Sequence, residues 1–329
     1  MAMSPSLAQN RRRGFLITAI VFLILLTAPA ALVGLYSQTY NTLTTQEVTK
    51  EQTLSDVAAL ALKVKLDKLV NIASSLASSP QLASDAKNGQ WTDAANAARD
   101  MENNVNFYDP FIDRIIIYDA SGTQQAAYPA LTGGLGTNAS SSAWYAALAN
   151  STQSFYVTNA TRRLSLPQIQ VVSIAVPIKT GQENTGFLVL QIPTDNFLEF
   201  AGNLDLGTYG FGYVVDAIGN IVAHPKVFSD SGSVVSYSFV PEVQKVIAGE
   251  SGTDIVSNQR DDEKSIITYK PVADYRWGII TQELYSEAFS TRSGILSGLG
   301  ILMAVLIVMD ALVSYLVFRI LISRKHDQV

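Results

Sequence analysis

The feature that most constrains this chain is an uncharged, apolar run at residues 14–36, GFLITAIVFLILLTAPAALVGLY. A helix of about 23 residues reaches roughly 35 Å, which is enough to cross the hydrocarbon core of a bilayer. A second apolar run, residues 293–318, contains a single charged residue, Asp310. The sequence therefore predicts two transmembrane helices that flank an insert of about 256 residues.

Basic residues beside the two runs predict the orientation of the chain. Three arginines at residues 11–13 precede the first run, and three basic residues within residues 319–325 follow the second. Because Lys and Arg favour the cytoplasmic side, we expect cytoplasmic tails at residues 1–13 and 319–329. The insert, residues 37–292, is then extracytoplasmic.

The first run also has features of a cleaved export signal. Residues 12–16 resemble a twin-arginine motif, and Ala28-Pro29-Ala30 resembles a small-residue cleavage site. The apolar run continues past this site to Tyr36, which favours a retained membrane helix. Both alternatives place the insert outside the cytoplasm.

The composition of the insert excludes several classes of function. The chain has no cysteine and a net charge of −5, and no cluster of basic residues lies in the insert. We therefore expect a buried core without disulfides and no nucleic-acid partner. His224 is the only histidine of the insert, so no metal site is expected. No catalytic pair or phosphate-binding loop is recognisable, and we expect neither a cofactor nor enzymatic activity.

Residues 37–80 are rich in helix-forming residues and contain no glycine or proline before Pro80, which predicts one long stalk helix. An apolar seam with coiled-coil spacing runs along it, formed by Leu62, Leu66, Leu69, Ala73 and Leu76. Two interpretations stay open. The seam forms a homodimer, or it packs against the helix's own domain.

The insert contains the same strand pattern twice. Residues 112–128 form an apolar, β-branched run, an Asp-Ala-Ser-Gly turn and a second short strand, and residues 209–225 repeat that order around an Asp-Ala-Ile-Gly turn. Two long strands follow in each copy. We predict an α+β fold with two tandem PAS-like antiparallel-sheet modules, a membrane-distal one at residues 81–204 and a membrane-proximal one at residues 205–292.

This arrangement resembles the double Cache extracytoplasmic domains of chemoreceptors and sensor kinases. Residues 213–225, YVVDAIGNIVAHP, are similar to that family's strand, Asp-x-x-Gly turn, strand and His-Pro signature. A short helix is expected at residues 143–149, and it carries the pair Trp144-Tyr145. This pair lies where the family's membrane-distal module has a Trp-Tyr pair. The resemblance covers about residues 15–322 and implies a sensor of small molecules that passes a small displacement through its flanking helices.

The resemblance places the ligand in the membrane-distal module, under a cover formed by residues 131–168. Amino-acid-sensing relatives resemble one another in an Arg two residues before Trp-Tyr and an Asp in the module's last strand. This chain has Ser142 and Gln191 at these positions. Because each end of a zwitterion needs a charged partner on losing water, we expect a small-molecule ligand that is not a standard amino acid.

The candidate ligand-binding residues have aromatic or neutral polar side chains, which suit a small, uncharged or weakly charged ligand. They are Tyr118, Trp144, Tyr145, Tyr156, Ser173 and Gln191. The alternative for Trp144 and Tyr145 is that they cover the sheet as core residues. Arg162 and Arg163 are interpreted as solvated surface residues, although one of them could hold an anion.

Three further polar residues are interpreted as structural. Asp119 and Asp216 are expected to close their turns by accepting hydrogen bonds from backbone N–H groups. The resemblance implies that His224, in the His-Pro pair, ends a strand.

The predicted function is a membrane-bound extracytoplasmic sensor. Only about eleven residues follow residue 318, so we expect a chain without its own output module that signals through a separate cytoplasmic or membrane partner. One rival is a surface scaffold with a filled distal core. Another is an accessory subunit that docks through Asp310, since a carboxylate at the centre of a span costs about 2.5 to 3.5 kcal/mol. Asp310 could equally lie near the cytoplasmic interface.

Overall fold

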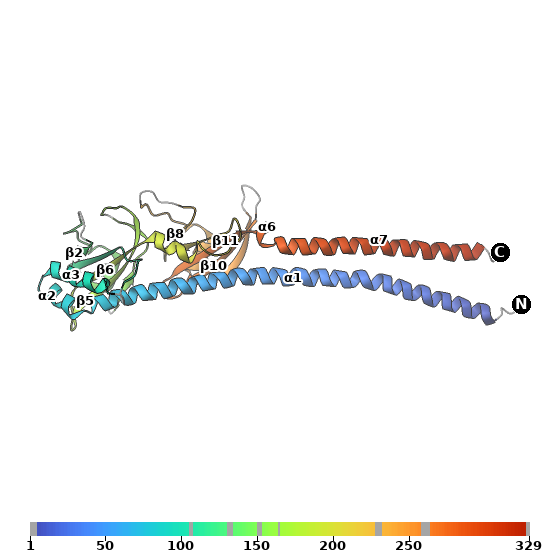
Figure 1. Ribbon diagram of the computed structural model, residues 1–329, viewed down its shortest axis with the longest axis horizontal. Coiled ribbons are helices and arrows are strands. Elements are labelled where there is room, and N and C mark those ends of the chain that lie inside the picture. Colours follow the sequence, from blue (N-terminus) through green and yellow to red (C-terminus); the bar gives the residue numbers. More distant parts are fainter. Residues whose placement is uncertain are drawn as a thin grey trace. The chain divides into compact units, whose positions relative to one another are not determined.

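The computed structural model contains two compact units (Figure 1). One unit, residues 50–287, carries both sheets, and the other combines residues 1–49 with residues 288–329. The structure describes residues 5–104, 108–129, 134–149, 153–163, 165–227, 232–257 and 264–326. The predicted cover at residues 131–168 and the two predicted tails lie partly outside these ranges.

Helix α1, Pro5–Ala77, contains the first predicted span and most of the predicted stalk helix. Beyond its end, Ser79 takes an extended conformation with φ −62° and ψ 123°, because the residue before a proline avoids the helical region. The Ser79 hydroxyl then accepts a hydrogen bond from the Leu82 N–H and caps helix α2, Pro80–Lys87. Helix α3, Trp91–Glu102, follows.

The apolar seam of α1 packs against the protein's own sheets. Its members are all 0% exposed and share one hydrophobic core with residues of both sheets: Leu62, Leu66, Leu69, Ala73 and Leu76. Burial of one leucine side chain stabilises a fold by about 1.5 to 3 kcal/mol. The structure therefore supports the second interpretation of the seam, and homodimerisation stays a prediction.

The first sheet has antiparallel strands in the order β2-β1-β6-β5-β3, with β4 also paired to β5. They are β1 (Arg114–Asp119), β2 (Gln124–Tyr128), β3 (Tyr156–Val157), β4 (Thr161–Arg162), β5 (Gln170–Thr180) and β6 (Glu183–Pro193). Successive side chains point to opposite faces. Ile115 and Ile117 lie in the core shared with α1, whereas Ile116 lies in a separate cluster with helix α4, Ala143–Ala149. Helix α4 begins and ends at the residues expected from the sequence.

The second sheet repeats this arrangement with antiparallel strands in the order β8-β7-β11-β10-β9. They are β7 (Phe211–Val215), β8 (Ile221–Ala223), β9 (Gly252–Ser257), β10 (Lys264–Val272) and β11 (Trp277–Leu284). Val243 and Val246 of helix α5, Pro241–Ile247, pack on one face. The 3-10 helix η1, Thr194–Phe200, connects the two sheets in the chain. Two antiparallel sheets and a long N-terminal helix confirm the α+β class.

The two Asp-x-x-Gly turns have the same backbone geometry. In the first turn the Asp119 N–H donates to the Thr123 carbonyl at 2.9 Å, and the glycine three residues after Asp119 has φ +82°. In the second turn the Asp216 N–H donates to the Asn220 carbonyl at 2.9 Å, and the corresponding glycine has φ +83°. Glycine adopts such a φ without strain, which explains its place in both copies. The internal repeat therefore extends to single hydrogen bonds.

Helix α7, Ser290–His326, follows the short helix α6, Tyr285–Ala288. Its segment Ser290–Leu316 is long and apolar enough to cross a membrane, and no other segment among the described residues qualifies. Most side chains of the first predicted span, residues 14–36, lie outside the described residues, so that span stays a prediction.

Candidate ligand-binding site

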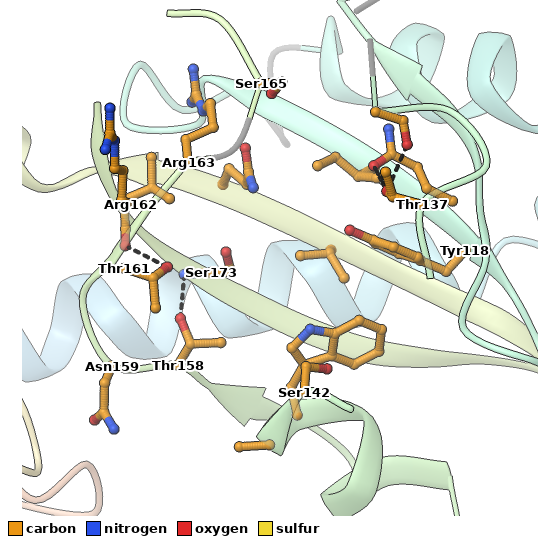
Figure 2. Close-up of a pocket in the computed structure, with 18 of the residues that line it drawn as sticks. Tyr118, Thr137, Ser142, Thr158, Asn159, Thr161, Arg162, Arg163, Ser165 and Ser173 are labelled. Atoms are coloured by element: carbon orange, nitrogen blue, oxygen red, sulfur yellow. Dashed lines mark hydrogen bonds between the residues drawn. The ribbon is translucent and has the colours of Figure 1, made fainter. Parts of the chain in front are cut away.

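A cavity of about 620 Å³ lies over the face of the first sheet that carries α4 (Figure 2). Known small-molecule sites measure about 300 to 1,000 Å³. Five of the six candidate residues line this cavity: Tyr118, Trp144, Tyr156, Ser173 and Gln191. They come from β1, α4, β3, β5 and β6, so only the fold brings them together.

The register of the central strands orders this face of the sheet into three rows. Residues directly opposite one another lie about 5 Å apart, and successive rows on one face lie about 6.6 to 6.8 Å apart. The rows are Arg114-Gln191-Ser173, Ile116-Val189-Ala175 and Tyr118-Phe187-Pro177. This face therefore changes from polar and cationic, through aliphatic, to aromatic. Five residues of these rows line the cavity: Gln191, Ser173, Ile116, Val189 and Tyr118.

The middle row of this face carries smaller residues in the first sheet than in the second. In the first sheet Ile116 lies three residues before the turn aspartate Asp119. In the second sheet Tyr213 lies three residues before the turn aspartate Asp216. Val189 lies between Ile116 and Ala175 in one row across three strands. In the second sheet Ile280 lies between Tyr213 and Tyr269 in the equivalent row. The second sheet therefore carries two tyrosine rings where the first has an isoleucine and an alanine.

The aromatic end of the cavity is formed by Trp144, which is 7% exposed. Its ring centroid lies 5.2 Å from that of Tyr118 and 5.4 Å from that of Phe187. Burial raises the pKa of Tyr118 to about 12, so its hydroxyl keeps its proton at neutral pH. Trp144 belongs to a core cluster and also lines the cavity, and its ligand-binding role stays a prediction.

The structure does not bring Tyr145 to the cavity wall. Its hydroxyl donates to the Ala120 carbonyl at 3.0 Å, and its ring lies so close to Gly122 that a Cβ there would approach it to 2.9 Å. Tyr145 therefore covers the first Asp-x-x-Gly turn. Ser142 also has a structural task, because its hydroxyl accepts from the Tyr145 N–H at the start of α4.

Three arginines lie at or beside the other end of the cavity, and Figure 2 shows Arg162 and Arg163 on the side opposite Tyr118. Arg162 is exposed as expected, but the surface interpretation of Arg163 is wrong, because Arg163 is only 2% exposed. Its Nη2 donates to Asp113, a residue 50 positions away in the chain. No pattern near Arg163 in the sequence indicated this long-range contact.

Buried polar atoms without a protein partner accompany these arginines. The Arg163 Nε and Nη1, the Gln191 Oε1 and the Gln124 Nε2 have no hydrogen-bond partner among the described residues. An unsatisfied buried donor or acceptor costs about 1 to 3 kcal/mol. Both glutamines and Arg163 line the cavity, so a ligand or ordered water there could satisfy these groups.

Arg114 completes the cationic end. It donates through Nη1 to the Ser165 hydroxyl at 2.8 Å and through Nη2 to the Leu166 carbonyl at 2.6 Å, and both partners line the cavity. Burial lowers the pKa of Arg114, and the neighbouring Arg163 charge acts in the same direction. Asp113 is the counter-charge, with its carboxylate 3.6 Å from the Arg114 Nε.

Two equivalent antiparallel sheets in tandem share a core with one long helix, and a cavity lies over the first sheet; this architecture defines a two-module α+β domain. The chain belongs to the Cache domain family, in its double Cache form, and the family model matches residues 36–292. The resemblance drawn from the sequence is thereby confirmed. The domains of this family are extracytoplasmic ligand-binding sensors of chemoreceptors and kinases.

Solved structures share this fold at low sequence identity. The ligand-binding domain of the Pseudomonas fluorescens chemoreceptor CtaA, in complex with L-isoleucine, aligns with a TM-score of 0.57 and 17% identity over 76% of this chain and 98% of that one. The ligand-binding domain of the Pseudomonas aeruginosa PAO1 amino acid chemoreceptor PctB, in complex with L-Arg, aligns with a TM-score of 0.55 and 17% identity over 72% of this chain and 95% of that one. The extracellular domain of the putative histidine kinase mmHK1S-Z2 aligns with a TM-score of 0.54 and 13% identity over 73% of this chain and 99% of that one. No curated protein is similar enough in sequence to be matched.

One expectation needs correction in the light of these structures. The absence of an Arg at Ser142 and of an Asp at Gln191 led us to expect a ligand other than a standard amino acid. The CtaA and PctB domains share this fold and bind L-isoleucine, L-leucine, L-serine, L-Arg and L-Gln. The expectation is therefore wrong. Its reasoning rested on two positions and treated Arg163, which is buried, as a solvated surface residue.

Proposed function

We propose that this chain is a membrane-anchored extracytoplasmic sensor that binds a small carboxylate-bearing molecule with an apolar tail in the cavity of the first sheet. The observation that carries this proposal is the gradient along the cavity face of the first sheet. It runs from Gln191 and Ser173, with Arg114 beside them in the same row, to the rings of Tyr118 and Trp144. A ligand with the same gradient lays its tail against the rings and its head over the polar row.

The charges at the polar end support an acidic head group. Arg114, Arg162 and Arg163 lie there with a single counter-charge, Asp113, and no Asp or Glu lies among the described residues that line the cavity. Guanidinium groups in a partly dry site bind carboxylates strongly. A cationic ligand would instead face uncompensated like charge.

An α-amino group is compatible with the same arrangement. The Gln191 Oε1 is a buried acceptor without a partner among the described residues, and Ser173 lies opposite it across the strands. An ammonium group could donate to these oxygens while its carboxylate meets the arginines. The amino-acid complexes of the CtaA and PctB domains make apolar amino acids the first ligands to test.

The cavity also favours a sensor over the rival scaffold, which requires a filled distal core. For the membrane topology we retain two spans with both termini in the cytoplasm and residues 37–292 outside. The apolar segment Ser290–Leu316 and the basic residues that flank both runs support this topology.

The proposal is tested by thermal unfolding of the full-length chain in detergent, followed by tryptophan fluorescence. The probes are L-leucine, 4-methylpentanoate, which is leucine without its amine, and 3-methylbutylamine, which lacks the carboxylate. A ligand at 100 times its Kd adds about 2.7 kcal/mol of stability. We expect L-leucine or 4-methylpentanoate to raise the Tm and the amine to have no effect. Stabilisation by the amine alone, or by none of the three, would contradict the proposed ligand class.

Replacement of Trp144 by alanine links the binding to this cavity. Loss of the ring that forms the aromatic end should weaken binding of the stabilising probe about 10- to 100-fold, the equivalent of about 1.5 to 3 kcal/mol of lost apolar contact. Isothermal titration calorimetry measures the change. Tyr145→Phe is the matched control, because its ring keeps its place over Gly122 and lies outside the cavity lining. Equal affinity in Trp144→Ala and the control would place the ligand elsewhere.

A further inference from the structure

The segment from β3 to β4, residues 156–163, forms one wall of the ligand cavity, and Thr158, Asn159 and Thr161 line it (Figure 2). Strands β3 and β4 contain two residues each, and both pair only with β5. Between them the Thr158 N–H donates to the Ser173 carbonyl at 2.8 Å. So short an edge segment needs further contacts to keep one conformation.

A carboxylate of the second sheet supplies such a contact. Ala160, at the middle of this wall, is 3% exposed, and its N–H donates to the Asp216 Oδ2 at 2.9 Å. Asp216 is 0% exposed and belongs to the turn after β7. A second hydrogen bond joins the same two sheets, from the Gln170 Nε2 of β5 to the Ile221 carbonyl of β8 at 2.6 Å.

The equivalent aspartate of the first sheet shows what is special about Asp216. In both turns the aspartate Oδ1 accepts from the backbone N–H groups two and four residues further on. The second oxygen differs. The Asp119 Oδ2 accepts from Gln125 of the neighbouring strand. The Asp216 Oδ2 accepts from the Asn220 Nδ2 of its own turn at 3.0 Å and also from the Ala160 N–H of the other sheet's cavity wall. The Oδ1 of Asp216 therefore closes the turn, and its Oδ2 joins the Asn220 side chain of that turn to the cavity wall of the other sheet.

We infer that Asp216 is a positioning residue for the ligand cavity, through which the second sheet holds the β3-β4 wall in its binding conformation. A displacement of that wall on ligand binding is then transmitted to the turn after β7, and β7 pairs with β11, the strand that leads into α6. The ligand part of this inference rests on the proposed function. The control of the wall by Asp216 does not.

Hydrogen–deuterium exchange of the full-length chain without ligand tests the control of the wall. In Asp216→Asn the amide oxygen can still close the turn, but the amide NH2 faces the Ala160 N–H, so donor meets donor. Loss of a charge-assisted hydrogen bond should speed exchange of the amides in residues 156–163 about 10-fold. Asp119→Asn, which disrupts the contact with Gln125 instead, is the matched control and should leave this segment unchanged. Unchanged exchange in Asp216→Asn, or an equal increase in both variants, overturns the inference.

A second pair of variants keeps the test decisive if Asp216→Asn does not fold. In Asp216→Ser and Asp119→Ser the single hydroxyl can close the turn, yet it cannot serve Ala160 as well. The same difference in exchange between the pair is expected.

The ligand part is tested by the affinity for L-leucine, which should fall about 10-fold in Asp216→Asn and stay unchanged in Asp119→Asn. Unchanged affinity together with faster wall exchange overturns the ligand part. If the wild-type chain does not bind L-leucine, the proposed ligand class is wrong, whereas the exchange result still decides the positioning role.

Discussion

At the residue scale, His224 takes its properties from the rings around it. Its ring centroid lies 5.1 Å from that of Phe211 and 5.0 Å from that of Tyr213, and its Nδ1 accepts from the Lys226 N–H at 3.0 Å. Burial lowers the pKa of His224 to about 4, and the Lys226 charge acts in the same direction. The folded chain therefore holds a neutral imidazole at neutral pH, in agreement with the structural interpretation of the His-Pro pair.

This depressed pKa predicts a pH dependence of stability. Between pH 6.5 and 4 the unfolded chain binds a proton at His224 more readily than the folded chain, so the contribution of His224 is complete above pH 6.5 and is lost as the pH falls toward 4. Between pH 7 and pH 4.5 the wild-type chain should lose about 2 to 3 kcal/mol more free energy of unfolding than His224→Gln. Urea unfolding at both pH values measures this difference. Parallel losses in the two proteins would show that His224 is not the titrating group.

At the element scale, helix α1 presents two different apolar faces within the sheet-bearing unit. Leu66 is 0% exposed in the core, whereas Val57, Leu60 and Val64 are 61%, 61% and 58% exposed. The leucine spacing found in the sequence correctly selected a buried stripe. It could not tell which surface buries that stripe, because a coiled-coil partner and a sheet both require a continuous apolar face.

Two leucines of α1 give a matched test of this assignment. Leu66→Ala should lower the free energy of unfolding by about 2 to 5 kcal/mol, because it leaves a cavity in a packed core. Leu60→Ala, with the same chemistry on the exposed face of the same helix, should change it by no more than about 0.5 kcal/mol. Chemical unfolding of both variants makes the comparison. A cost above about 2 kcal/mol for Leu60→Ala would mean that a partner covers this face.

At the scale of the whole molecule, both sheets follow the same strand order around equivalent turns. They differ in what fills the helix-covered face, where Tyr213 and Tyr269 of the second sheet replace Ile116 and Ala175 of the first. One fold thus carries a cavity over the first sheet and two tyrosine rings at the equivalent middle row of the second. In the proposed sensor, the first copy binds the ligand and the second copy connects to the membrane helix.

The proposed membrane topology predicts a labelling pattern for single cysteines. The chain has no cysteine, so each introduced thiol reports alone. A membrane-impermeant maleimide added to intact spheroplasts should label Ser75→Cys, an exposed position of the insert, and should not label Ser6→Cys or His326→Cys. Lysis should expose all three. Labelling of either terminal position in intact cells would contradict the two-span topology.

The sequence by itself determined the local structure of this protein. The Asp-x-x-Gly spacing placed both turns, because closing such a turn needs an aspartate acceptor and a glycine at positive φ, and both requirements are local. The same holds for α4 at Ala143–Ala149, since helix signals lie within one stretch of chain. The two-residue strand β4 was not expected, because so short a strand has no periodicity of its own.

Only the tertiary structure decided the site. The buried Arg163 donates to Asp113, 50 residues away, and the second oxygen of Asp216 accepts from Ala160, 56 residues away. Such contacts depend on the register between strands that are distant in sequence, and register is set by the packing of the whole sheet. The cavity has the same origin. Its volume depends on which side chains of separate strands meet on one face of the sheet, and the sequence of a single strand does not contain that information.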